Sequence, residues 1–60
     1  MSQLCFAAGN GDAAQVELLL KDGVDVNQVD GQKQTALHHA ARGAHLDVAQ
    51  ILLDAGANVN

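Results

Sequence analysis

The sequence lacks proline, tryptophan and tyrosine, and its 60 residues include one cysteine, one phenylalanine and three permanent cations. A lone cysteine cannot form an internal disulfide, which favours a reducing compartment such as the cytoplasm or the nucleus. No stretch approaches the roughly 18 apolar residues of a membrane span, and the first residues lack the positive start of a signal peptide. We therefore expect no membrane contact and no disulfide-stabilised fold.

Positive charge is scarce, since Lys21, Lys33 and Arg42 stand against seven acidic residues and give a net charge of −4. Binding a polyanion requires several clustered cations, so we expect no nucleic-acid partner. The negative balance instead favours a neutral or basic protein partner. Because interface hot spots favour Trp, Tyr and Arg, Arg42 and Phe6 are the strongest anchors that the chain offers.

The chain contains two copies of one unit, because residues 2–27 align with residues 35–60 at an offset of 33. A fixed period of this length indicates a repeat architecture. The matched residues are small, apolar or turn-forming: Leu4 and Leu37, Ala7 and Ala40, Ala8 and Ala41, Leu19 and Leu52, Leu20 and Leu53, Gly23 and Gly56, Val26 and Val59, and Asn27 and Asn60.

Each copy predicts two antiparallel helices. The first copy has a short helix over residues 3–8 that Ser2 caps, a break over residues 9–11, and a second helix that Asp12 opens and Gly23 ends. In the second copy, Thr35 is the expected N-cap with His38 three residues on. Apolar residues at helical spacing are expected to face inward; they are Leu4, Ala7, Ala8, Val16, Leu18, Leu19, Leu20, Leu37, Ala40, Ala41, Val48, Ile51, Leu52 and Ala55.

Residues 24–34 predict an extended connector with its tip near Asp30–Lys33. The second copy then carries Thr-x-Leu-His-x-Ala-Ala, Leu-Leu and Gly-Ala-Asn-Val-Asn, and at a period of 33 it resembles the ankyrin repeat. It departs from that pattern with Ala36 in place of Pro, Lys33 in place of Gly, and Gly43-Ala44 in place of Asn-Gly. The first copy lacks the Thr-Pro-Leu-His motif, as terminal capping repeats often do.

The resemblance implies an all-α, ankyrin-type solenoid of two stacked helix-turn-helix units joined by an extended hairpin loop. The first unit then covers residues 1–29 and the second covers residues 30–60. Such units bury their apolar faces only against their neighbours.

No catalytic or metal-binding motif is evident in the sequence. His38 and His39 are adjacent on a helix and point about 100° apart, while His45 lies beyond a helix break. No cysteine or carboxylate stands at zinc-site spacing from them. Cys5 aligns with His38 and fits a buried small hydrophobe. We therefore predict no enzyme activity, no metal site and no cofactor.

The resemblance also implies a recognition surface at the hairpin tip and the exposed side of the first helix. The residues that correspond to it here are Gly31, Gln32, Lys33, Gln34, His39 and Arg42, followed by Gly43. We predict a non-catalytic protein–protein interaction module. Because the sequence stops where a third unit would begin, an alternative is a regulatory or scaffolding segment of a larger multidomain protein or enzyme. Self-association through the open face of the second unit is a further alternative.

Overall fold

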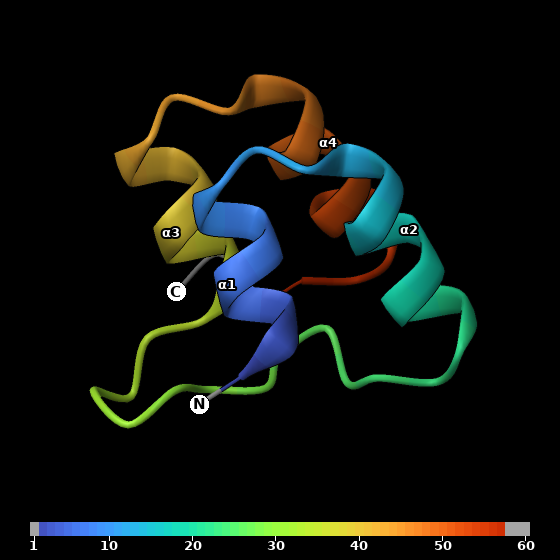
Figure 1. The fold of residues 1–60 in the computed structure, drawn as a ribbon, viewed down its shortest axis with the longest axis horizontal. Helices are drawn as coiled ribbons and strands as arrows, with labels where there is room; N and C mark the ends of the chain where they lie inside the picture. The colour runs from blue at the N-terminus through green and yellow to red at the C-terminus, as the bar shows by residue number, and fades with distance from the viewer. Residues whose placement is uncertain (1, 58–60) are drawn as a thin grey trace.

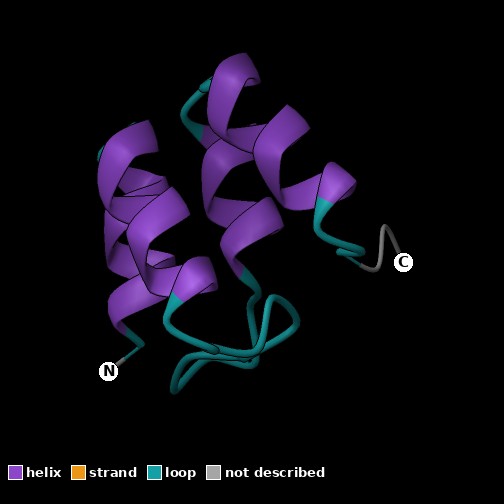
Figure 2. Cartoon of the chain, turned by 90° about the vertical axis from the view of Figure 1, so that its right-hand side faces the viewer, coloured by secondary structure: helices purple, strands orange, loops and turns teal. Residues whose placement is uncertain are grey.

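The computed structural model describes residues 2–57 and places two antiparallel helix pairs side by side. The first pair is α1 (Gln3–Gly9) and α2 (Ala13–Lys21), and the second pair is α3 (Ala36–Arg42) and α4 (Leu46–Asp54). Figure 1 shows α1 beside α3 and α2 beside α4, and Figure 2 shows the connecting loop gathered at one end of the helices. The all-α, two-unit architecture is confirmed. Val59 and Asn60, which close the second copy, lie outside the described residues.

Side-chain caps begin three of the four helices in residues 2–57. The side chains of Ser2, Asp12 and Thr35 each accept a hydrogen bond from the amide three residues on, at 3.2, 3.2 and 3.4 Å. His38 completes a capping box, because its Nδ1 accepts from the amide of Thr35 at 3.2 Å. The helix starts predicted from the sequence are therefore confirmed.

Left-handed backbone follows the helices, as the glycine pattern predicts. Gly23 and Gly56 have φ values of 96° and 95°, each one residue past a helix C-cap. The turn between α3 and α4 differs from its counterpart in the first unit. Gly43 has a φ of −86°, and Ala44 adopts the left-handed φ of 57° that Gly11 supplies at 73° in the first unit. The second unit thus holds a residue with a Cβ in a conformation that favours glycine.

One hydrophobic core joins the two units, because α1 packs on α3 and α2 packs on α4. Three more leucine and isoleucine side chains, Leu20, Leu37 and Ile51, pack against this core and are partly buried. The residues of the core are Leu4, Cys5, Ala7, Ala8, Val16, Leu19, Ala36, Ala40, Val48 and Leu52. The shared interior predicted from the repeat is confirmed, and so is the burial of Cys5.

Three residues expected to face inward are exposed instead. Leu18 is 60% exposed, because it lies about 200° around α2 from Val16 and so points away from the buried stripe. Ala41 is exposed although its counterpart Ala8 is fully buried, since α1 faces the second unit and nothing in residues 2–57 covers the far side of α3. Ala55 is exposed where α4 has already ended. In the described part of the chain, α2 and α4 are the longest helices at nine residues, and no helix there is long and apolar enough to cross a bilayer.

Candidate partner-binding surface

The connector between the units folds back on itself as a narrow hairpin. Val29 and Thr35 form an antiparallel bridge, and the amide of Asp30 donates to the carbonyl oxygen of Gln34 at 2.9 Å. The Oδ1 atom of Asp30 accepts from the amides of Gln32 and Gln34 at 2.8 and 3.0 Å. A single carboxylate oxygen therefore holds the tip of the hairpin closed.

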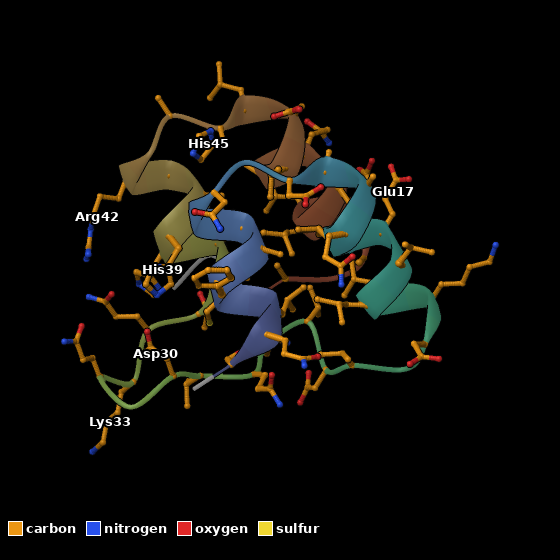
Figure 3. The ribbon with its side chains drawn as sticks, viewed as in Figure 1. Glu17, Asp30, Lys33, His39, Arg42 and His45 are labelled. Atoms are coloured by element: carbon orange, nitrogen blue, oxygen red, sulfur yellow. The ribbon has the colours of Figure 1, made fainter. Side chains whose placement is uncertain are left out.

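Five of the seven residues predicted for partner contact lie open to solvent. Gly31, Gln32 and Lys33 are exposed at the hairpin tip, and Arg42 and Gly43 are exposed at the end of α3. In Figure 3 the side chains of Lys33 and Arg42 both point away from the body of the molecule on the same side. Gln34 differs, since it is half-buried and its Oε1 atom is buried without a hydrogen-bond partner among the described residues.

His39 is bound to the hairpin rather than free. Its Nε2 atom donates to Oδ2 of Asp30 at 2.7 Å, and the two side chains are 23% and 15% exposed. The amide of Gln34 lowers the pKa of Asp30 from 3.8 to about 2, with further help from His39 and the amide of Gln32. His39 thus fixes α3 against the hairpin, and this positions the surface around it.

Cys5 lies beside this pair, an arrangement that the sequence spacing does not indicate. One ligand atom from each of Cys5, Asp30 and His39 lies within 4.8 Å of the other two. The Sγ atom donates to the carbonyl oxygens of Gln34 and Gln28 at 3.4 and 3.8 Å. From the sequence no metal site is expected, because His38 and His39 diverge and no cysteine or carboxylate stands at zinc-site spacing from the histidines. The members of this cluster are 9, 25 and 34 positions apart, and only the fold of the hairpin brings them together.

His45 connects the two units at the opposite end of the helices. Its Nε2 atom donates to the carbonyl oxygen of Gly9 at 3.1 Å. A Cβ added at Gly11 or Gly43 would come within 2.6 Å of the imidazole ring. The ring therefore fits only because both helix–helix turns have glycine, which has no Cβ, at these positions. The sequence did not predict this contact, because Gly9 and His45 are 36 positions apart.

Comparisons with known proteins agree with this architecture. A family model described as ankyrin repeats (three copies) matches residues 1–60. The crystal structure of the human ASB11 ankyrin repeat domain superposes with a TM-score of 0.94 at 38% identity, covering 100% of this chain and 27% of that one.

Sequence relatives contain this segment within longer chains. The human histone-lysine N-methyltransferase EHMT1 is 42% identical over 60 residues, which is 97% of this chain and 5% of that protein. Human ankyrin repeat domain-containing protein 39 is 45% identical over 51 residues, which is 85% of this chain and 28% of that protein. The chain thus spans less than a third of each of these relatives.

Ankyrin repeats are generally non-catalytic modules that bind other proteins, and such segments also occur inside enzymes. The family match over the whole chain, the superposition and the two stacked helix pairs lead to one assignment. The chain belongs to the ankyrin repeat family.

Proposed function

We propose that this chain is a protein-interaction module that acts by binding and not by catalysis. Its recognition surface is the hairpin–α3 surface, defined as residues 29–42, and its partner is an acidic segment of another protein. The observation that carries this proposal is the sign of the charge on that surface.

The hairpin–α3 surface has the opposite charge to the rest of the chain. It holds two permanent cations, Lys33 and Arg42, and one carboxylate, Asp30, which gives +1. The other residues hold six carboxylates and one cation, Lys21, which gives −5. The Asp30 carboxylate already accepts hydrogen bonds from two amides and from His39, so it is engaged within the fold. The hairpin–α3 surface therefore complements acidic groups, although the chain as a whole has a net charge of −4.

The placement of the cations supports an acidic partner over a basic one. Lys33 and Arg42 come from two different segments, yet both side chains point outward on the same side of the molecule (Figure 3). An extended peptide that crosses from the hairpin tip to the end of α3 meets both charges. Exposed ion pairs contribute about 0.2–1 kcal/mol each. Binding by this surface alone is consequently weak and depends on salt.

The relatives also support the alternative predicted from the sequence, in which this chain is a regulatory or scaffolding segment of a larger multidomain protein or enzyme. The chain corresponds to 5% of one relative and 28% of another. We therefore propose that the segment supplies recognition within a larger protein or enzyme. In that setting, neighbouring repeats would extend the hairpin–α3 surface and add affinity.

Selection from a random peptide library displayed on phage tests the partner class. Peptides captured by the wild-type chain are expected to be enriched in Asp and Glu. The double variant Lys33→Gln/Arg42→Gln should bind those peptides about tenfold more weakly, because two exposed ion pairs are lost. Lys21→Gln is the matched control, since it removes a cation at the end of α2, outside the surface, and should bind like the wild type.

Two results would reject the proposal: selected peptides with no acidic bias, or equal binding by the double variant and the wild type. Circular dichroism of each variant establishes that the helices are retained. Sedimentation velocity over a wide concentration range separates peptide binding from self-association. A second copy would pack on the side of the second unit that faces away from the first, where Leu53 is 40% exposed. Leu53→Glu would abolish such a dimer while leaving peptide capture intact.

A further inference from the structure

We propose that Cys5, Asp30 and His39 form a binding site for a divalent transition-metal ion, with zinc(II) as the preferred occupant. This cluster is not needed for partner recognition at Lys33 and Arg42. The proposal rests on the position, the chemistry and the existing hydrogen bonds of the three side chains.

The three residues converge from three separate segments. Cys5 lies in α1, Asp30 in the hairpin and His39 in α3, and their ligand atoms lie within 4.8 Å of one another. They line a shallow hollow of about 300 Å³ that Phe6 and Asn10 also border. In Figure 3, Asp30 and His39 face each other on the side of the molecule where the hairpin meets α3. An ion therefore has both a donor set and an open approach.

The donor set matches the chemistry of zinc. Thiolate, imidazole and carboxylate are its usual protein ligands, at about 2.0–2.3 Å in a tetrahedral arrangement. Ligand atoms around such an ion are about 3.3–3.8 Å apart. The Nε2 atom of His39 and Oδ2 of Asp30 are already 2.7 Å apart. Side-chain movements of about 1 Å are thus sufficient to bring the three ligand atoms to zinc-binding distance, and a water molecule supplies the fourth ligand.

The hairpin does not need to open for Asp30 to bind an ion. Its Oδ1 atom accepts hydrogen bonds from the amides of Gln32 and Gln34. Within residues 2–57, its Oδ2 atom accepts a hydrogen bond only from His39. Coordination through Oδ2 therefore leaves the tip of the hairpin intact. The thiol of Cys5 likewise gives up only weak contacts, of 3.4 and 3.8 Å to two carbonyl oxygens.

The proton balance of binding is simple. The Cys5 thiol releases its proton to solvent, because the thiolate is the ligand. His39 coordinates through Nε2 as a neutral imidazole, with its proton on Nδ1. Asp30 is already ionised at neutral pH, since its pKa lies near 2. Uptake is therefore accompanied by release of one proton and weakens as the pH falls.

Occupancy would tie the two units together. The ion connects α1 of the first unit to α3 of the second and to the hairpin between them. Metal that binds only the folded chain also stabilises it in proportion to the logarithm of its concentration. Zinc is thus expected to raise the melting temperature of the whole chain as well as to occupy the cluster.

Cobalt(II) titration of the full chain, reduced with a phosphine, tests the site directly. The wild type should bind one cobalt ion with tetrahedral d–d bands and a thiolate-to-cobalt charge-transfer band, and zinc(II) should remove both. Cys5→Ala should lose the charge-transfer band. His39→Phe should weaken binding by at least about tenfold; phenylalanine is the residue at the equivalent position 6 of the first unit.

His38→Gln is the matched control, because it removes the neighbouring imidazole and leaves a side chain that can still complete the capping box. It should bind cobalt as the wild type does, and circular dichroism should show that all three variants remain helical. The proposal is overturned if the wild type gives no charge-transfer band. Equal cobalt affinity in Cys5→Ala and the wild type, or equal loss in His38→Gln and His39→Phe, would overturn it as well.

Discussion

The two units share a sequence pattern but expose opposite kinds of outer face. Gln3 and Gln15 are exposed on the first unit, whereas the residues at the equivalent positions of the second unit, Ala36 and Val48, are fully buried. These positions face the preceding unit, which only the second unit has within residues 2–57. The first unit therefore has exposed amides at the positions where the second unit has buried apolar side chains.

The opposite side of each unit shows the reverse difference. Leu4 and Ala8 of the first unit are fully buried. Their counterparts in the second unit are not, since Leu37 is half-buried and Ala41 is exposed. The residues are identical and only the neighbour differs. Burial in a stacked repeat thus depends on position in the stack and not on residue type, since each unit covers only the unit beside it.

Exchanging polar and apolar residues at equivalent positions of the two units should have the largest effect on stability. Val48→Gln places an amide in the fully buried seam, where it is too large and lacks partners, at a cost of about 3 kcal/mol or more. A domain of this size has little stability to lose, so we expect the variant to be unfolded by circular dichroism. Gln15→Val at the equivalent exposed position should change stability by less than about 0.5 kcal/mol.

A Val48→Gln chain that melts like the wild type would show that the seam between the units is not the source of stability. The reciprocal change carries its own check. Gln15→Val adds an apolar side chain to the exposed face of the first unit, so any loss of solubility should appear only in that variant.

Glycine substitutions at the turns separate the effect of contacts between the units from the effect of backbone strain within one unit. Gly11→Ala combines a left-handed backbone with a collision against His45 and should cost about 2–3 kcal/mol. Gly43→Ala meets the same ring without backbone strain, and Gly23→Ala has the strain with open space around it. Each should cost about 1–2 kcal/mol in urea denaturation.

Gly31→Ala is the control for this series, because it is exposed and no atom lies within 4 Å of an added Cβ. Its stability should match the wild type within about 0.5 kcal/mol. If Gly43→Ala were equally neutral, the contact between His45 and the first unit would contribute nothing to the packing of the two units.

Acid should weaken the hairpin contact that the second unit has and the first unit lacks. His39 binds Asp30, whereas the equivalent residue of the first unit, Phe6, is 61% exposed. The folded-state pKa of Asp30 lies near 2, below its ordinary value of 3.8. Its stabilising effect is thus fully present above pH 3.8 and is lost as the pH falls towards 2.

Denaturation midpoints measured between these pH values test the contribution of Asp30. Asp30→Asn should be less stable than the wild type above pH 3.8, and the two should converge near pH 2. Glu17→Gln, which changes an exposed carboxylate on α2, should keep the acid sensitivity of the wild type. A constant difference between Asp30→Asn and the wild type at every pH would show that the ionisation of Asp30 does not matter.

Local signals in the sequence predicted most of the fold. Cap residues such as Thr35 act on amides three positions away, and glycines such as Gly23 act on their own backbone, so neighbours in sequence suffice. Seven recognition residues were predicted through the family resemblance, and five of them are exposed. His39 and Gln34 depart from that expectation because their surroundings come from the folded hairpin.

The repeat of 33 is evident from the alignment of the two copies in the sequence alone. The four helices, their caps and most of the apolar stripes are also predictable from the sequence, because each follows from residues within one or two helical turns. Tertiary contacts determine which copy of a repeated residue is buried, how His45 fits between two glycines, and that Cys5 lies beside Asp30 and His39. Those outcomes depend on contacts between segments far apart in the chain. Their geometry is set when the two units stack and not by the spacing of residues along either one.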